Sequence, residues 1–355
     1  MRMRSAIDPL SDLLRVVRLD SAFFYAVEAA APWGIETAAA RELAPRILPG
    51  AEHLIGYHIL TRGRCFAGLP GDEQVELAPG DVVVFPHGDA NLMSSSRGLR
   101  LTPGVNTRAP ARYPDICLIG DRSRGDASLV CGFLGCDRRP FNPLLAALPR
   151  MMHVRGMSDG WPGGFARQLT EESRLGRAGS ECILSRLAEL MFIGVVRRYL
   201  EDLPAGQTGW LAGLRDEVVA RALTLLHGRP GHSWTLDELA REAASSRSNL
   251  TKRFTALVGQ PPMQYLAQWR MQVAADRLVR SGARVAAVGA EVGYDSEPAF
   301  SRAFKKITGL APGAWRERAA NAAERAASRS RGMSSAPAPP LRSVPARARA
   351  SARSG

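Results

Sequence analysis

An internal repeat in the second half of this 355-residue chain constrains its fold more than any other feature of the sequence. Residues 234–266 resemble residues 283–316 at an offset of 49 to 50 positions, with apolar, glycine and proline positions kept in register. The matched pairs include Leu236 and Val285, Leu239 and Val288, Phe254 and Phe304, Gly259 and Gly309, and Pro262 and Pro312. Apolar residues at helical spacing predict a short helix, a tight turn and a second helix in each copy.

Capping residues mark where these predicted helices begin. In the first copy, Thr235 and Glu238 form a capping-box pattern, and Ser246 can cap the second helix. In the second copy, residues 293–295 form the turn and Ser296 is the cap. This arrangement predicts a helix-turn-helix, which holds its second helix across the first so that its outer face can enter a major groove.

The outward positions of the two second helices are polar and mostly basic, as contact with DNA requires. These predicted DNA-binding residues are Arg247, Ser248, Thr251 and Lys252 in the first copy and Glu297, Ser301, Arg302, Lys305 and Lys306 in the second. Residues 263–280 predict one connecting helix of about 27 Å, at roughly 1.5 Å per residue. Such a helix can hold two recognition helices about one DNA turn apart, near 34 Å. A plain helical bundle would explain neither the repeat nor the basic faces.

The formal net charge of +13 is concentrated in the second half of the chain. Residues 1–205 hold 24 basic and 23 acidic side chains, whereas residues 206–318 hold 16 and 10. Residues 319–355 hold seven arginines and one glutamate. This asymmetry favours a neutral module joined to one that meets a polyanion.

The first half predicts a different architecture. Short apolar runs bounded by turn residues predict strands at 23–29, 53–60, 74–77, 81–86, 115–120 and 128–135. Many strands without intervening helices are typical of an antiparallel barrel or sandwich. Helices are predicted at 165–175 and 180–202, a linker at 204–210, and disorder in the Arg/Ser/Ala/Pro tail at 319–355.

Both halves resemble parts of a known family. The stretch WTLDELAREAASSRSNLTKRFTALVGQ and, above all, VGYDSEPAFSRAFKK are similar to the AraC/XylS-type DNA-binding domain, a likeness that covers about residues 210–318. The segments DPLSDLLRVVRL, LAPGDVVVFPHGDA and NPLLAALPRMMHVRG resemble the branch in which a cupin barrel precedes that domain. The resemblance implies an all-β cupin-like barrel with a helical dimerisation pair over 7–205, an all-α tandem helix-turn-helix over 206–318, and a tail.

Two positions depart from the family pattern. Ala244 stands in the first turn where the family usually has glycine. If this position needs a left-handed backbone, alanine costs roughly 1 kcal/mol there. Pro298 lies in the first turn of the second recognition helix, where proline is tolerated but offers no polar group to a base.

The predicted barrel lacks most of the metal ligands of cupin enzymes. The first cupin motif is reduced to His58, and Asn91 occupies the usual histidine position of the second. His87 lies in a loop, and His53 should face the opposite side of its strand from His58. A transition metal wants three or more well-placed ligands. No metal and no cofactor are therefore predicted, and His58, His87 and Asn91 are candidate effector-pocket residues.

The five cysteines leave a redox role open. Cys131 and Cys136 have an odd spacing, which places them on opposite faces of a straight strand. Cys65 and Cys117 lie on other predicted strands, and Cys182 begins a helix. Ordinary buried cysteine is the simplest interpretation of each, and no CxxC pair is present. Sparse cysteines, with no secretory signal or membrane-length apolar run, predict a cytoplasmic protein.

The sequence as a whole predicts a cytoplasmic transcription regulator rather than an enzyme, since it contains no GxSxG, P-loop, GxGxxG or HExxH motif. Three alternatives stay open: a metal-dependent cupin enzyme tethered to a DNA-binding domain, a redox-sensing regulator, and an architectural DNA protein without a ligand. The predicted partners are double-stranded DNA, RNA polymerase, an unidentified effector and a second copy of the chain. The homodimer is predicted through the helix at 180–202, whose apolar residues cover more than one stripe.

Overall fold

A computed structural model of the chain describes most of its residues. The described ranges are 8–17, 19–48, 51–99, 102–103, 116–119, 125–136, 140–156, 168, 171–172, 177–204 and 206–333. No helix within them is both long and apolar enough to cross a membrane.

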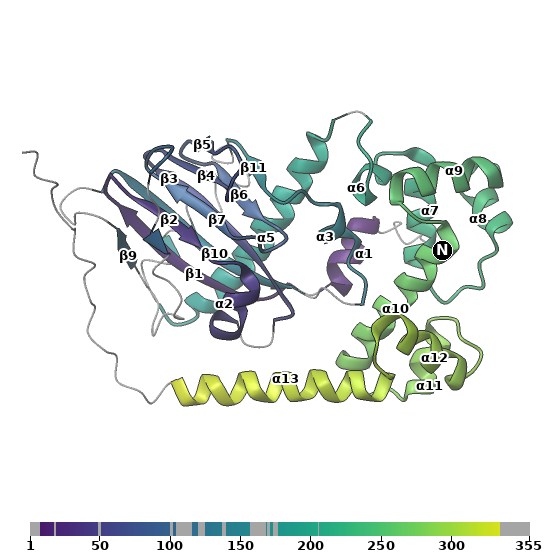
Figure 1. Ribbon diagram of the computed structural model, residues 1–355. Helices are drawn as coiled ribbons and strands as arrows, with labels where there is room; N and C mark the ends of the chain where they lie inside the picture. Colours follow the sequence, from purple (N-terminus) through teal and green to yellow (C-terminus); the bar gives the residue numbers. More distant parts are fainter. Residues whose placement is uncertain are drawn as a thin grey trace, which may run out of the picture.

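The first half contains two β-sheets (Figure 1). The six-stranded sheet has the order β11 (Met152–Val154), β6 (Val82–Phe85), β3 (His53–Arg62), β10 (Ala127–Cys136), β1 (Leu19–Ala29) and β9 (Ile116–Ile119). The five-stranded sheet has the order β5 (Val75–Leu77), β4 (Cys65–Gly68), β7 (Asn91–Ser94), β2 (Gly34–Thr37) and β8 (Thr102–Pro103). Neighbouring strands are antiparallel except in the β1–β9 and β2–β8 pairs. Every strand expected from the sequence is present.

The described strands form two packed sheets, and no closed barrel is found among them, in contrast to the barrel that the resemblance implies. Along β3, Leu54 and Leu60 belong to the core that both sheets share, whereas Ile55 and Tyr57 belong to a second core. All ten residues of β10 are buried. The six-stranded sheet is thus covered on both faces, by the other sheet and by helices, and the fold is layered.

Helices with described bounds accompany the sheets. They are α1 (Pro9–Val16), α2 (Ala40–Ile47), α3 (Pro143–Ala147) and α5 (Ser180–Glu201). Helix α5 confirms the helix expected at 180–202 and contacts β1 and β11. Its residues Ile183 and Leu190 remain 43% and 38% exposed. The helix expected at 165–175 falls almost entirely outside the described residues.

The second half is helical and lies beside the sheets in Figure 1. Its helices are α6 (Trp210–Gly213), α7 (Glu217–Gly228), α8 (Leu236–Glu242), α9 (Arg247–Val258), α10 (Pro262–Arg280), α11 (Val285–Glu291), α12 (Glu297–Thr308) and α13 (Pro312–Met333). Helices α8–α9 and α11–α12 are the two expected helix-turn-helix units, and α10 is the connecting helix.

The expectation of disorder from residue 319 onward is wrong for residues 319–333, which continue helix α13. Alanine and arginine make up nine of these fifteen residues, and both have high helix propensity. Residues 334–355 lie outside the described part of the chain.

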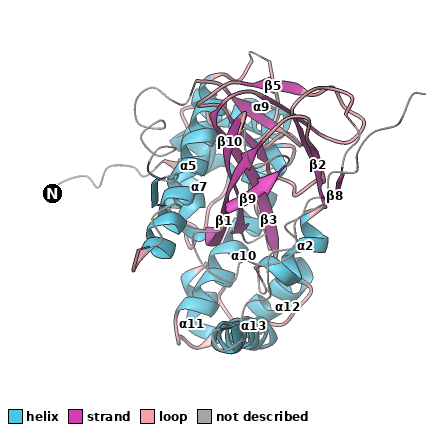
Figure 2. Cartoon of the chain, turned by 90° about the vertical axis from the view of Figure 1, so that its left-hand side faces the viewer, coloured by secondary structure: helices cyan, strands magenta, loops and turns pink. Residues whose placement is uncertain are grey.

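A continuous core joins the two halves. It runs from the six-stranded sheet through α1, α3 and α5 to α6, α7, α9 and α10. The backbone N–H of Phe141 donates to Oε1 of Gln272 over 2.9 Å, and the Phe141 ring meets Tyr265 edge-on. A separate core holds the second helix-turn-helix, and Figure 2 shows α11, α12 and α13 grouped at one end of the molecule. The helical half is therefore packed against the sheets rather than tethered by a free linker.

Candidate DNA-binding interface

Helix α9 begins where the sequence predicts and exposes its expected DNA-binding residues. Oγ of Ser246 accepts from the backbone N–H of Asn249 over 3.3 Å. Leu250 and Phe254 lie on the inner face of the helix and are fully buried. Arg247, Ser248 and Lys252 are exposed, and Thr251 is partly buried, with its hydroxyl donated to the Arg247 carbonyl. Arg247 also lies 3.7 Å from the Asp237 carboxylate, but both side chains are well exposed, so this pair holds Arg247 only weakly.

Helix α12 has the same arrangement, with three cations and one acidic residue among its expected DNA-binding residues. Oγ of Ser296 accepts from the N–H of Ala299 over 3.4 Å, and Phe300 and Phe304 are fully buried. The expected residues lie on the other side of the helix. Glu297, Arg302, Lys305 and Lys306 are exposed, and Ser301 is partly buried. Within the described part of the chain, no ion pair involves Arg302, Lys305 or Lys306. These cations are therefore available to phosphates and base edges.

The turns within the two units have the same geometry but different residues. In the first, Ala244 has φ +53° and donates to the Arg241 carbonyl over 3.1 Å. In the second, Gly293 has φ +85° and donates to the Ala290 carbonyl over 3.0 Å. The conditional expectation for Ala244 is thus met, because the position does require a left-handed backbone. Glycine adopts this conformation without the Cβ conflict that alanine incurs.

A close backbone contact fixes the two units relative to each other. A Cβ on Gly231 would lie 2.4 Å from the Glu291 carbonyl oxygen, and one on Gly293 would lie 2.6 Å from the Gly231 carbonyl oxygen. From α10, Arg270 donates to the carbonyls of Pro230 and His232, each over 2.7 Å. The loop before the first unit is thereby held against the turn of the second, so the two units are joined through backbone contacts as well as through α10.

Sequence reasoning did not identify Arg270 as a positioning residue, nor the contact between Asp216 and Arg253. Asp216 caps α7 by accepting from the backbone N–H groups of Val218 and Val219, and Nε of Arg253 on α9 donates to the same carboxylate over 3.1 Å. An aspartate just before an apolar helix is a recognisable capping signal. The roles of Arg253 and Arg270 carry no comparable signal, because their partners are far away in the sequence.

Two of the three candidate effector-pocket residues meet inside the first half. His58 and Asn91 are 3% and 2% exposed, and Nε2 of His58 lies 3.1 Å from Oδ1 of Asn91. Burial lowers the pKa of His58 to about 4, while the hydrogen bond to Asn91 acts in the opposite direction. The imidazole is therefore neutral near pH 7. His87 is elsewhere, since Nε2 contacts the Leu148 carbonyl at the start of the loop after α3.

The same interior also holds Cys65 and Cys131, which were candidates for a redox role. Among the described residues, no group of three or more His, Cys, Asp or Glu side chains is arranged to hold a metal ion. Burial raises the pKa of Cys65 to about 12 and that of Cys131 well above its usual value. Since the thiolate is the reactive form, these two buried cysteines are poor redox sensors. Cys131 and Cys136 belong to different cores, as their spacing predicts.

Comparisons with known proteins cover both halves. A family profile described as Cupin matches residues 8–201, and one described as Helix-turn-helix domain matches residues 239–318. A putative AraC-like transcription regulator of Streptomyces antibioticus is 35% identical over 88% of this chain and 99% of its own length. The HTH-type transcriptional regulator AlkR of Acinetobacter baylyi is 27% identical over 88% and 99%. A crystal structure of a DNA-binding transcriptional dual regulator from Escherichia coli K-12 is 30% identical over 30% of this chain and 96% of its own, with a TM-score of 0.29.

Proposed function

The chain belongs to the AraC-like transcription regulators, and from that membership we propose that it recognises specific double-stranded DNA through the outward faces of α9 and α12. One observation carries the proposal. Two similar helices, each capped by serine, expose cations toward one side. Among the described residues, Lys252 on α9 and Arg302, Lys305 and Lys306 on α12 form no ion pair. Sequence is read by long donors such as Arg302 at base edges, while Lys252 and the other lysines neutralise phosphates.

Arg302→Ala tests whether α12 reads bases. We expect a loss of about 1–3 kcal/mol in binding to a duplex selected from random sequence, with a much smaller loss on random DNA. Both affinities are measured by fluorescence anisotropy at one fixed salt concentration, because phosphate contacts depend on salt. Arg221→Ala on α7 is the matched control, since Arg221 is an exposed arginine paired with Glu217 outside the recognition helices. Equal losses on selected and random DNA would show that Arg302 contacts phosphate only.

We also propose that the sheet-bearing half senses an effector and mediates dimer formation. Leu184, Met191 and Val195 on one side of α5 are buried, whereas Ile183 and Leu190 are exposed. An exposed apolar stripe beside a buried one suits contact with a second copy. A dimer would place four recognition helices on two half-sites and raise affinity through effective concentration.

The remaining parts of the proposal follow from this role. We propose a division into 7–205, 206–318 and a C-terminal segment at 319–355. The start of the second domain is supported by Trp210 on α6, which donates through Nε1 to the Tyr265 hydroxyl of α10. RNA polymerase is the partner through which a DNA-bound regulator acts on transcription, and the cytoplasm is where both are found. A regulatory rather than catalytic protein is favoured, since its similar relatives are transcription regulators.

A further inference from the structure

Pro298 lies in the first turn of α12, where it is exposed to solvent. It stands two residues before Phe300, and Arg302 stands two residues after Phe300. Because an α-helix turns about 100° per residue, both positions are about 200° away from the fully buried Phe300 side chain. Pro298 and Arg302 therefore lie one above the other on the face of α12 that points away from its core.

This outward face of α12 combines positive charge with one apolar surface. Arg302, Lys305 and Lys306 are exposed and form no ion pair within the described part of the chain. Among the exposed residues of the face, Pro298 alone is apolar. Figure 1 shows both recognition helices on the side of the molecule away from the sheets, so the face is open to a partner. The three cations suit phosphates and base edges, whereas the proline ring suits neither.

The matching position of α9 is polar. At the offset of 50 residues between the two copies, Pro298 corresponds to Ser248, and Arg302 corresponds to Lys252. Ser248 is exposed at the same point of its helix, two residues after the serine cap. Helix α9 thus begins without a proline, so a proline is not needed at this position to start the helix of such a unit. The proline gives α12 a surface that α9 does not have.

The chemistry of the major groove decides what this surface can recognise. The first residues of a recognition helix contact base edges. The proline ring has no hydrogen-bonding group, and it loses no rotamer freedom when it is buried. Every base pair presents polar atoms in the major groove, but thymine alone also presents a methyl group. Covering the polar edge of another base would leave its atoms without partners, which costs free energy. The methyl group of thymine is therefore the feature that the Pro298 ring fits.

Arg302 determines where this thymine lies, because arginine most often pairs with guanine in the major groove. Residues four positions apart are separated by about 6 Å along a helix, and neighbouring base pairs are about 3.4 Å apart. We propose that Pro298 selects a thymine through its C5 methyl group, within about two base pairs of the guanine that Arg302 reads. The proposal rests on the proposed function, because it requires that α12 enters a major groove.

Replacement of thymine by deoxyuracil tests the contact, because it removes the methyl group and leaves base pairing unchanged. The wild-type chain first selects sequences from random duplexes, and Arg302→Ala identifies the preference that depends on Arg302. The thymine beside that preference is then replaced. We expect wild-type affinity, measured by fluorescence anisotropy at one fixed salt concentration, to fall about fourfold, which equals about 0.8 kcal/mol for one buried methyl group. Deoxyuracil in the flanking sequence is the control and should leave affinity unchanged.

Pro298→Ser gives α12 the residue that α9 carries at the matching position. This variant should bind the thymine and deoxyuracil duplexes equally, since it makes no contact with the methyl group. Its affinity for random DNA and its circular dichroism spectrum should match the wild type, because the cations and the Ser296 cap remain. Pro261→Ser is the matched control, since Pro261 is an exposed proline that precedes α10 outside the recognition helices. It should keep the full preference for thymine.

Equal affinity of the wild type for the thymine and deoxyuracil duplexes overturns the proposal, and this measurement does not depend on the folding of any variant. Selected sequences without a thymine beside the preference that depends on Arg302 overturn it as well. So does a loss of the same size in Pro298→Ser as in the wild type. A wild-type chain that selects no sequence at all would instead refute the proposed function, so the two failures are distinguishable.

Discussion

Ala244→Gly should stabilise the helical half, although it removes a methyl group. Ala244 is exposed, so its Cβ buries no surface, and its φ of +53° lies in the left-handed region. A non-glycine residue pays about 1–2 kcal/mol in that region. Glycine also gives the unfolded chain more conformational freedom, which lowers the stability of the folded protein by about 0.4–1 kcal/mol. The net expectation is a stabilisation of about 0.5–1 kcal/mol.

The assay is urea unfolding of the full chain, followed by tryptophan fluorescence and by circular dichroism at 222 nm. Ala256→Gly is the matched control, because Ala256 is an exposed residue inside the right-handed helix α9. The same substitution there should destabilise by about 1 kcal/mol. If alanine-to-glycine raises the free energy of unfolding at position 244 and lowers it at position 256, the difference comes from the backbone conformation of the two sites. A loss of stability in Ala244→Gly equal to that in Ala256→Gly would refute the reasoning.

Three further outcomes follow from the structure. Ile183→Arg combined with Leu190→Arg should convert a dimer to a folded monomer in sedimentation velocity at micromolar concentration, and a wild type that is already monomeric contradicts the proposed interface. Because the folded pKa of His58 is lowered to about 4, the unfolded chain takes up the proton first, and stability should fall as pH drops from about 6.5 toward 4. The fall, monitored by urea midpoints, should be smaller in His58→Gln but unchanged in the exposed-residue control His87→Gln. Removing residues 334–355, which hold four arginines, should flatten the salt dependence of non-specific DNA binding, and an unchanged slope would show that these arginines release no counterions.

The helical half could be predicted closely because its local signals agree with one another. Capping serines, buried phenylalanines and glycines after the recognition helices mark α9 and α12 directly, and even the strain at Ala244 is visible from its family position. In the first half, the long apolar strands β3 and β10 were found, and so were the short β6 and β9, because each is one unbroken apolar run. Strands β2, β4, β7, β8 and β11 were missed, since they are equally short but mix polar or small residues with apolar ones and so resemble loops.

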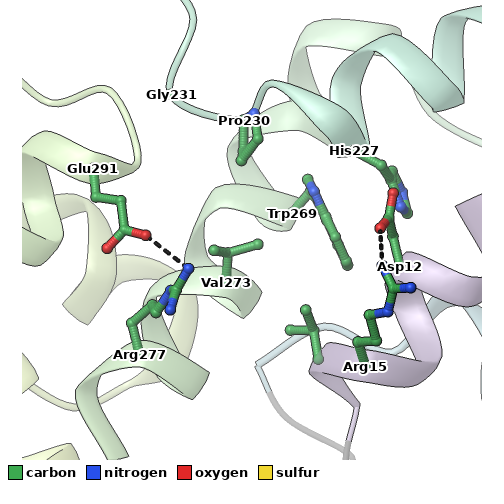
Figure 3. A pocket seen from close by; sticks show the side chains of 10 residues that line it. Asp12, Arg15, His227, Pro230, Gly231, Trp269, Val273, Arg277 and Glu291 are labelled. Atoms are coloured by element: carbon green, nitrogen blue, oxygen red, sulfur yellow. Dashed lines mark ion pairs between the residues drawn. The ribbon is translucent and has the colours of Figure 1, made fainter. Parts of the chain in front are cut away.

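The features that sequence reasoning missed depend on contacts between distant residues. Helix α1 has an ordinary amphipathic sequence, and only the folded chain shows that it lies against α7 and α10. The pocket lined by Asp12, His227 and Trp269 (Figure 3) therefore could not be anticipated, because these residues are far apart in the chain. His87 was grouped with His58 by its motif, yet its ring bonds to the Leu148 carbonyl instead. Motif position alone did not determine where that loop side chain points.

Selection of bound sequences from random duplexes tests the central claim most directly, carried out in parallel with wild type and Arg302→Ala. The structure predicts two blocks of base preference about one helical turn apart, near 10 base pairs, one for each recognition helix. Arg302→Ala should erase preference in one block and leave the other intact, because α9 keeps its own contacts. A single block in the wild type, or loss of both blocks in the variant, would contradict DNA reading by two independent recognition helices.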